Sequence, residues 1–350
     1  MKHPTYFTWS PLDANQTGNI PSSDDSILRY VERIISELSP QDKVIGIQIP
    51  EGLKPTVLKL VSQLKIDKPE IVTIVFFEPC YGSCDIIEGR HDSIDKIFHF
   101  GNSGMPDLNS KKTIFIEMYN ESDGEEIEEV LDIAKSMGGP VGLLYNIQYR
   151  KNLLRLEQQL KAVDIDCMLG QGSKRIKYPG QLLGCNYSAL TNIEMSVDWY
   201  ILYTHGLFHL EVIPLVSQKK VLVVDLLNQT IKWISDIETN VLAARKSLMD
   251  ECREAVEFGL LVSSKIGQDR LAEAYDMQRY LASHGKIGHL LMGDNLFSKY
   301  FTNIPIDAYI NFGCPRVAIN NSAKFDRPIL TVSEVKSLIN NEEYQYDTIE

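Results

Sequence analysis

Short apolar runs alternate along this chain with segments in which apolar residues recur every three or four positions. A short apolar run bounded by turn residues predicts a buried strand, and the wider spacing predicts a helix with one face on a core. Strands that alternate with helices indicate parallel α/β units. We predict strands at 44–49, 71–77, 93–101, 113–117, 141–145, 166–170, 196–206, 221–226, 259–264 and 305–313, and helices near 27–38, 53–64, 127–134, 153–160, 238–256 and 271–281.

The sequence also contains an internal repeat. Three predicted strands share one form, in which Ile or Val is followed by Asp, an apolar stretch and Gly, with the aspartates at Asp95, Asp198 and Asp307. They lie roughly one third of the chain apart, and such a period indicates repeated structural units. The predicted fold class is therefore α/β, with three similar Rossmann-like domains whose parallel sheets have a pseudo-threefold arrangement. The predicted division is a mobile N-terminal arm at 1–21, domain 1 at 22–110, domain 2 at 111–218 and domain 3 at 219–350.

The charge balance argues against some classes of partner. The 350 residues hold 47 Asp and Glu against 35 Lys and Arg, a formal net charge of −12. Nucleic acids and anionic membranes favour clustered Lys and Arg, so neither is expected as the main partner. The chain shows no apolar signal-peptide segment and no apolar run long enough to span a membrane. We expect a cytoplasmic protein whose cysteines stay reduced.

Three of the six cysteines occupy equivalent places in the repeat. Cys80, Cys185 and Cys314 each follow an apolar run and stand beside a Gly or Pro turn, one in each predicted domain. Parallel α/β sheets bind ligands at the carboxyl ends of their strands. Three sheets that face inward would bring these thiols to one centre, although they are far apart in the sequence.

Three thiolates without an evident fourth protein ligand suit a 4Fe–4S cluster with one open iron. Structural zinc prefers four closed ligands, so zinc stays an alternative if Cys84 or a histidine joins the three. Cys84 has the spacing to chelate with Cys80, but it has no counterpart in the other domains, and we expect it to pack. Cys167 and Cys252 are expected to act as small core hydrophobes. An open iron can bind a substrate directly, which favours catalysis over simple electron transfer.

Six motifs occur in order along the chain: EPCYGSCD, HFGNS, PGQLLGC, GLFH, SKIGQ and NFGCPR. In these motifs, and over residues 44–330, the chain resembles the diphthamide synthesis family, most closely its archaeal-type 2-(3-amino-3-carboxypropyl)histidine synthases. One departure is Asn102, which stands where the family often has His. The resemblance covers most of the chain, and the length and order of the motifs argue against a chance match.

The resemblance implies a cofactor, a reaction and partners. Enzymes of this family are homodimers of three similar domains, in which three cysteines hold a 4Fe–4S cluster. By motif position these would be Cys80, Cys185 and Cys314. After reduction by an electron donor that the sequence does not identify, the cluster cleaves S-adenosylmethionine and leaves methylthioadenosine. The 3-amino-3-carboxypropyl radical then adds to a histidine of translation elongation factor 2, the first step of diphthamide biosynthesis.

Other polar residues stand where such a cofactor could bind. Arg316 follows the third cysteine and could pair with a carboxylate, and His209 could hydrogen-bond near the cluster. Tyr81 shapes the turn that presents Cys80. Each of these residues also has an ordinary structural explanation as turn, cap or ion-pair chemistry. The strand-end loops of the first and last domains add Gln48, Glu51 and Gly52, and Ser264, Gly267 and Gln268, as candidate contacts of the cofactor.

Two other functions stay open at this point. A quinolinate-synthase-like dehydratase also has three similar domains, each of which gives one cysteine to a cluster whose open iron acts as a Lewis acid. The second alternative is a non-catalytic partner subunit of a diphthamide synthase complex, which is expected to have lost cluster cysteines. Formation of methylthioadenosine from S-adenosylmethionine separates the synthase from the dehydratase.

Overall fold

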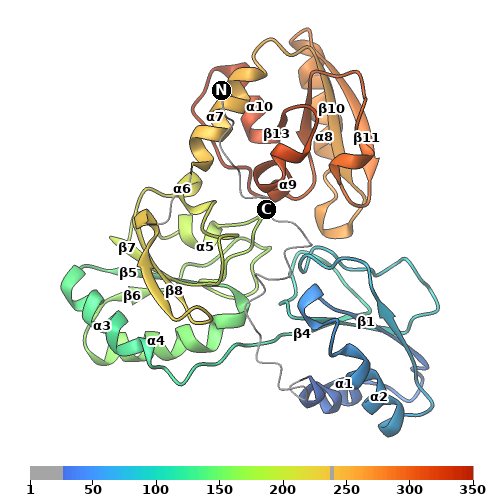
Figure 1. Cartoon of the computed structure of the whole chain (residues 1–350), viewed down its shortest axis with the longest axis vertical. Helices are drawn as coiled ribbons and strands as arrows, with labels where there is room; N and C mark the ends of the chain where they lie inside the picture. Colours follow the sequence, from blue (N-terminus) through green and yellow to red (C-terminus); the bar gives the residue numbers. More distant parts are fainter. Residues whose placement is uncertain (1–26, 237–239, 350) are drawn as a thin grey trace.

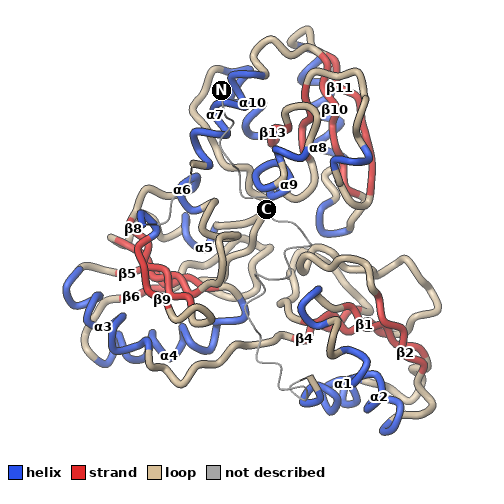
Figure 2. Tube along the Cα trace, viewed as in Figure 1, coloured by secondary structure: helices blue, strands red, loops and turns tan. Residues whose placement is uncertain are grey.

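The structure, a computed structural model, describes residues 27–236 and 240–349. Within these residues the strands form three sheets, and each sheet with its helices makes one lobe of the molecule (Figure 1). Loops make up most of the region where the lobes meet (Figure 2). The α/β class agrees with the prediction, whereas the pseudo-threefold relation stays a prediction and the arm at 1–21 lies outside the described residues. No helix in the described ranges has the length and apolar character needed to cross a membrane.

The first unit is a parallel sheet with the strand order β2-β1-β3-β4. Its strand β1 contains Ile45 and Ile47, which are fully buried, as is usual for a parallel sheet covered by helices. Helix α2 buries Leu60 and Leu64 in the same core, at the spacing that predicts it. The elements are η2 (Leu28–Tyr30), α1 (Val31–Glu37), β1 (Val44–Gln48), η3 (Glu51–Leu53), α2 (Val57–Asp67), β2 (Val72–Phe76), β3 (Lys96–Phe100) and β4 (Thr113–Ile116).

The second unit has the strand order β6-β5-β7-β8-β9, parallel except for the last pair. Every residue of β5 and β7 is buried, so these strands read as continuous apolar runs in the sequence. Helices α3 and α4 pack on this core through Val130, Leu153 and Leu156. The elements are α3 (Glu126–Met137), β5 (Val141–Tyr145), η4 (Ile147–Tyr149), α4 (Arg150–Ala162), β6 (Cys167–Met168), α5 (Ser188–Thr191), β7 (Trp199–Tyr203), α6 (Ile213–Val216), β8 (Lys220–Asp225), β9 (Thr230–Trp233) and η5 (Ile234–Asp236).

The third unit is a parallel sheet with the strand order β11-β10-β12-β13. Helix α8 packs Ala274, Met277 and Leu281 into its core. Strand β11 is not among the predicted strands, and as an edge strand it buries none of its residues fully. The elements are α7 (Val241–Glu251), β10 (Glu257–Ser263), η6 (Ile266–Gln268), α8 (Leu271–Ser283), β11 (Ile287–Gly293), η7 (Ser298–Tyr300), β12 (Ala308–Asn311), α9 (Pro315–Asn320), η8 (Ser322–Lys324), β13 (Ile329–Thr331) and α10 (Val332–Asn340).

The aspartates of the internal repeat have a structural role. The carboxylate of Asp95 accepts hydrogen bonds from the backbone N–H groups of residues 43 and 44, at 2.7 and 2.9 Å. The carboxylate of Asp307 accepts the equivalent bonds from residues 256 and 257, at 2.8 and 2.9 Å. Asp198 uses its own N–H, which donates to the carbonyl just before β5 at 2.8 Å. In each unit the repeat thus ties the start of one strand to its neighbour.

The sheets do not end where the domain boundaries are predicted. Strand β4 is predicted to open domain 2, but it pairs with β3 and belongs to the first sheet. Strand β8 is predicted to open domain 3, but it pairs with β7 in the second sheet. The reason is that periodicity identifies a strand without showing which sheet edge it joins. The first and second sheets therefore extend beyond the predicted boundaries at 110 and 218.

An ion pair is buried in the core of the third unit. Arg245 of α7 donates to both carboxylate oxygens of Glu334, at 2.7 and 2.5 Å, and neither side chain is more than 1% exposed. Arg245 also donates to the carbonyl groups of Ala318 and Ile329, both at 2.8 Å. Glu334 accepts the N–H of Thr331 and closes a capping box at the start of α10. The pair therefore joins α7, α9, β13 and α10.

Arg245→Met is expected to lower the free energy of unfolding by about 3–5 kcal/mol, because it leaves the Glu334 charge buried without its partner. The double variant Arg245→Met/Glu334→Gln is expected to recover part of this loss, since an amide is neutral and still accepts the capping N–H. Urea unfolding followed by circular dichroism measures both variants. If Arg245→Met had the same free energy of unfolding as the wild type, the ion pair could not lie in an environment without water.

Asp95 is expected to stabilise the fold in a pH-dependent way. Its bonds from the backbone of residues 43 and 44 hold its pKa below the ordinary value of 3.8. A carboxyl group whose pKa is lowered by folding adds stability above the unfolded-state pKa, and this is lost as the pH falls through the folded-state pKa. Asp95→Asn should therefore destabilise at neutral pH and cost progressively less below about pH 4. Urea midpoints of variant and wild type across this range test the expectation, which fails if their difference is constant.

Candidate functional site

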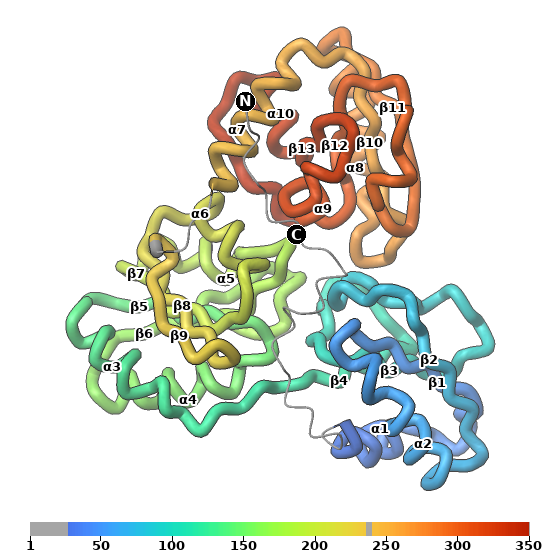
Figure 3. Tube along the Cα trace, viewed as in Figure 1, coloured from blue at the N-terminus to red at the C-terminus, as the bar shows by residue number. Residues whose placement is uncertain are grey.

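The predicted thiols lie in loops that follow strand ends. The loop after β2 carries Cys80 and Cys84, the long loop between β6 and α5 carries Cys185, and the turn between β12 and α9 carries Cys314. Segments of the three units come together near the C-terminal end of the chain (Figure 3). All six cysteines of the sequence are described and are free.

Cys84 is bound directly by the third unit. The backbone N–H of Gly267 donates to the Cys84 carbonyl at 3.2 Å, and Gln268 Nε2 donates to Cys84 Sγ at 3.3 Å. A side chain at position 267 would not fit, because its Cβ would lie 2.4 Å from the Cys84 Cα. The glycine of the SKIGQ motif thus permits the close approach of two units. The predicted cofactor contacts Gly267 and Gln268 both meet this cysteine.

Cys84, Cys185 and Cys314 lie within electrostatic reach of one another. Burial, followed by the charges of Cys84 and Cys185, raises the pKa of the Cys314 thiol to about 12. Burial, followed by Cys185, raises the pKa of Cys84 to about 11. Cys185 packs with Met105 and Ile349 in an apolar cluster that Cys84 contacts. We name these three thiols the cysteine centre.

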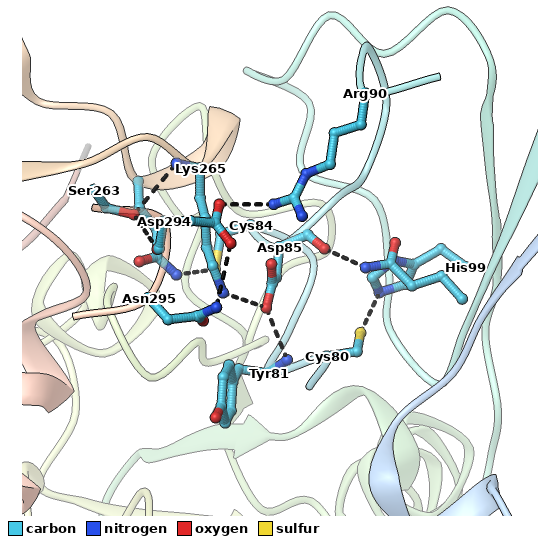
Figure 4. Close-up of polar contacts among 12 residues, drawn as sticks. Cys80, Tyr81, Cys84, Asp85, Arg90, His99, Ser263, Lys265, Asp294 and Asn295 are labelled. Atoms are coloured by element: carbon cyan, nitrogen blue, oxygen red, sulfur yellow. Dashed lines mark hydrogen bonds and ion pairs between the residues drawn. The ribbon is translucent and has the colours of Figure 1, made fainter. Parts of the chain in front are cut away.

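Cys80, the thiol predicted for the first unit, has different surroundings. Its sulfur lies 3.7 Å from Nε2 of His99 in its own unit (Figure 4). Burial, followed by the charges of Asp85 and Cys84, raises its pKa to about 12. Cys84, which the sequence predicts only to pack, is the cysteine of this loop that is bonded to another unit. The contacts therefore favour Cys84 over Cys80 as the first unit's member of the centre.

A small hydrogen-bond network orders the residues around Cys80. His99 contacts Gln48 Oε1 through Nδ1 at 3.0 Å, and Asn102 Nδ2 lies 3.0 Å from its Nε2. Burial lowers the pKa of His99 to about 3, so the ring is neutral. Gln48 also donates to the Asp85 carbonyl, just after Cys84. Gln48, predicted as a cofactor contact, thus supports the cysteine loop itself, and His99 is a fully buried residue of the first unit.

Several predicted contacts lie at the surface. Glu51 forms an ion pair with a lysine three residues away at 2.6 Å, and both Glu51 and Gly52 of η3 are exposed. Ser264 is exposed beside the loop that holds Gly267. The ring of Tyr81 is 43% exposed, and its centroid lies 5.1 Å from the ammonium group of Lys265. A role for these four residues in binding a cofactor stays a prediction.

Arg316 and His209 have unused polar atoms beside the third cysteine. The Arg316 guanidinium lies 4.4 Å from the ring centroid of Phe208, and its Nη2 donates to the Phe208 carbonyl and to Glu211 Oε2, the latter at 3.2 Å. Its Nε and Nη1, and Nδ1 of His209, are buried and have no hydrogen-bond partner in the described residues. Burial, followed by Arg316, lowers the pKa of His209 to about 3. Such groups are costly unless a ligand supplies their partners.

Two buried cations of the site are missed by the sequence prediction. Lys265 pairs with Asp85 at 2.7 Å across the third and first units, and both side chains are 4% exposed (Figure 4). Arg175 of the second unit is 4% exposed and pairs with Asp107 of the first unit at 3.3 Å. Such residues are ordinarily at the surface. No local spacing distinguishes them, so only the folded arrangement reveals them.

The C-terminal segment of the third unit covers the cysteine of the second. The N–H of Ile349 donates to the Cys185 carbonyl at 3.1 Å, and Asn186 Nδ2 donates to the Ile349 carbonyl at 2.8 Å. The Tyr346 hydroxyl donates to the Gly184 carbonyl at 3.0 Å. Residues of all three units therefore enclose the cysteine centre.

The donor set fits an iron–sulfur cluster. Among residues 27–236 and 240–349, no three His, Cys, Asp or Glu side chains are grouped as ligands of one metal ion. The thiolates of a cluster bind different iron atoms, so they stand further apart than the ligands of a single ion. The three thiols are in mutual electrostatic reach, Cys185 buried and Cys84 and Cys314 half-buried, and with the unpartnered N–H donors on Arg316 they suit such an anionic group.

Curated relatives match the chain over most of its length. It is 29% identical over 334 residues to the 2-(3-amino-3-carboxypropyl)histidine synthase of Pyrococcus horikoshii, with 94% of this chain and 93% of that protein covered. It is 28% identical over 344 residues to the protein of the same name from Methanocaldococcus jannaschii, with 91% and 92% covered.

Solved structures and a family profile agree with these matches. The crystal structure of Dph2 from Pyrococcus horikoshii with a 4Fe–4S cluster has a TM-score of 0.79 at 28% identity, and the match covers 93% of both chains. A second crystal structure of Dph2 from Pyrococcus horikoshii also has a TM-score of 0.79, at 29% identity. The profile of the diphthamide synthesis proteins matches residues 49–349. This chain therefore belongs to the diphthamide synthesis protein family.

Proposed function

We propose that this chain is a 2-(3-amino-3-carboxypropyl)histidine synthase, which transfers the 3-amino-3-carboxypropyl group of S-adenosylmethionine to a histidine of translation elongation factor 2. This reaction is the first step of diphthamide biosynthesis. The observation that carries the proposal is the cysteine centre, in which strand-end loops of three units bring three thiols within electrostatic reach, with Cys84 packed against the Cys185 cluster and bonded to Gln268. The names of the archaeal relatives and the cluster in the similar Dph2 structure support the same activity and cofactor here.

The proposed cluster ligands are Cys84, Cys185 and Cys314. This set replaces Cys80 with Cys84, because Cys84 is bonded to the third unit and lies near both other thiols. The raised pKa values of Cys84 and Cys314 mean that neither thiol ionises readily without a nearby positive charge. Iron supplies that charge and favours the thiolate form. One iron then lacks a protein ligand and is open to the substrate.

When it is bound and reduced, the cluster supplies the electron that breaks a C–S bond of S-adenosylmethionine, which leaves methylthioadenosine and a 3-amino-3-carboxypropyl radical. Arg316 offers two N–H groups, Nε and Nη1, to the carboxylate of this substrate. His209 is neutral, so its free Nδ1 adds one hydrogen bond without adding charge. Gln268 holds Cys84 and completes the wall on the side of the third unit.

Enclosure by three units protects a reactive radical from side reactions. Ile349 and Met105 pack on Cys185 from the third and first units, so apolar groups lie directly beside the thiols. The proposal also includes a homodimer in the cytoplasm and a separate protein that donates electrons. The net charge of −12 gives no reason to add a nucleic acid or a membrane to these partners.

The dehydratase is the second candidate, because an open iron between three similar units could also act as a Lewis acid. The free N–H groups of Arg316 do not separate the two enzymes, since both substrates carry carboxylates. The extended match to the synthases favours transfer from S-adenosylmethionine. A non-catalytic partner subunit is disfavoured because the chain keeps a thiol in each unit at the centre.

Cys84→Ala and Cys80→Ala separate the two possible ligand sets. After anaerobic reconstitution, Cys84→Ala and Cys185→Ala are expected to lose most of the bound iron and sulfide, whereas Cys80→Ala should keep them. Cys252→Ala is the control, since this thiol is buried in the hydrophobic core of the third unit. If Cys80→Ala lost the cluster and Cys84→Ala kept it, the ligand set predicted from the sequence, with Cys80 in place of Cys84, would be correct. If Cys185→Ala left cluster content and the activity of an assembled complex unchanged, the partner-subunit alternative would be correct.

Incubation of the reduced protein with S-adenosylmethionine should yield methylthioadenosine, and elongation factor 2 should gain one 3-amino-3-carboxypropyl group on a histidine. Liquid chromatography measures the first product, and mass spectrometry of the modified peptide measures the second. Arg316→Met should raise the KM for S-adenosylmethionine more than it lowers kcat, because it removes a contact to the carboxylate. A protein with an intact, reducible cluster that forms no methylthioadenosine would support the dehydratase instead.

A further inference from the structure

We propose that Arg175 is the positioning residue that holds the three units together at the cysteine centre and places a permanent positive charge beside its thiols. Arg175 lies in the long loop between β6 and α5, in the second unit. This inference rests on the proposed function, because it concerns the cluster that the centre would hold.

The guanidinium of Arg175, a residue of the second unit, is bonded to both the first and the third unit. Its Nη1 pairs with Asp107 Oδ2 of the first unit at 3.3 Å, and its Nη2 donates to the Gly267 carbonyl of the third. Gly267 is the residue whose N–H binds Cys84, so Arg175 and Cys84 hold opposite ends of one peptide segment. Within its own unit Arg175 lies within electrostatic reach of the Cys185 thiol. One planar side chain thus fixes the loops that carry two of the three thiols.

Arg175 also places a positive charge near these thiols. Its Nη2 is bonded to Gly267, whose N–H is bonded to the Cys84 carbonyl, and its guanidinium lies within electrostatic reach of both Cys84 and Cys185. A guanidinium stays protonated at every relevant pH, so this positive charge is permanent. A lysine could supply the charge but not the planar fork of donors.

The positive charge of Arg175 is only partly balanced by the acidic groups near it in the described residues. Its single ion-pair partner in the described residues, Asp107, makes one contact at 3.3 Å, and the other carboxylate oxygen of Asp107 is buried without a partner. Nε of Arg175 is also buried without a partner. A buried cation with so loose a pair is costly unless further negative charge lies nearby. Thiolates that hold an anionic cluster would supply that charge, and the free Nε–H could donate to their sulfur.

Residues around a cluster control its retention and its reduction potential. Removing the Arg175 charge should make the addition of an electron less favourable and so shift the midpoint potential to a more negative value. Loss of the planar N–H donors of Arg175 should also make the loops of Cys84 and Cys185 less rigid, and iron should then dissociate from the cluster faster. Changes in residues that support metal ligands typically weaken metal binding by about 10–100-fold.

The test compares the reconstituted wild type with Arg175→Met, Arg175→Lys and the control Arg155→Met. Arg155 lies in the same unit and also donates to a backbone carbonyl, but it is exposed. The measurements are bound iron and sulfide, the rate of iron loss to a chelator, and the midpoint potential from an EPR-monitored redox titration. Arg175→Met is expected to lose iron about tenfold faster and to show the more negative potential. Arg175→Lys should lose iron faster but keep a potential near that of the wild type, and the control should match the wild type in all measurements.

Unchanged iron retention together with an unchanged midpoint potential in Arg175→Met would overturn the inference while leaving the proposed function intact. If Arg175→Met does not fold, Arg175→Lys decides, and retention equal to that of the wild type then overturns the inference. A wild-type protein that takes up no iron and sulfide would overturn the proposed function and this inference together.

Discussion

The arrangement depends on the burial of charges where the strand-end loops of three sheets meet. The polar groups of a parallel α/β unit gather at the carboxyl ends of its strands, and here those ends are packed against one another instead of being solvated. Two buried cations of this region are paired with groups of another unit, Lys265 with Asp85, and Arg175 with Asp107 and a carbonyl of the third unit. A buried charge that loses its partner is strongly destabilising. The relative position of the units is therefore a condition for their stability as well as for the site.

The same burial explains why this region suits a metal group. The pKa values of the Cys84, Cys185 and Cys314 thiols are raised, and burial is the largest cause. Two arginines, Arg175 and Arg316, lie beside this group with N–H donors that no other described residue accepts. Exchange of the thiol protons for iron would place negatively charged thiolates beside these cationic donors. Burial, thiols and arginines together therefore favour binding of a metal group.

Much of the fold follows from the sequence because central parallel strands are buried on both faces. Strands β1, β5, β7 and β10 are continuous apolar runs and were predictable for that reason. Edge strand β11 was not predictable, since its half-exposed residues lack such a run. Asp95 and Asp307 marked the repeat because their carboxylates make the same two bonds in different units. Arg175 and Lys265 left no local pattern, since their burial arises only when separate units pack together.

Repeat symmetry and the observed contacts favour different cysteines of the first unit. Symmetry favours Cys80, the cysteine nearer the strand end, as the counterpart of Cys185 and Cys314. A residue so close to a strand end stays in its own unit, and Cys80 accordingly lies against His99, whose strand pairs with β1. Cys84 lies in the next turn, which is closed by the bond from the Asp85 N–H to the Gly82 carbonyl at 3.0 Å, and there it meets Gly267 and Gln268 of the third unit. The equivalent positions of a repeat fix where loops begin, but the turn conformation and close glycine contacts decide which side chain reaches another unit.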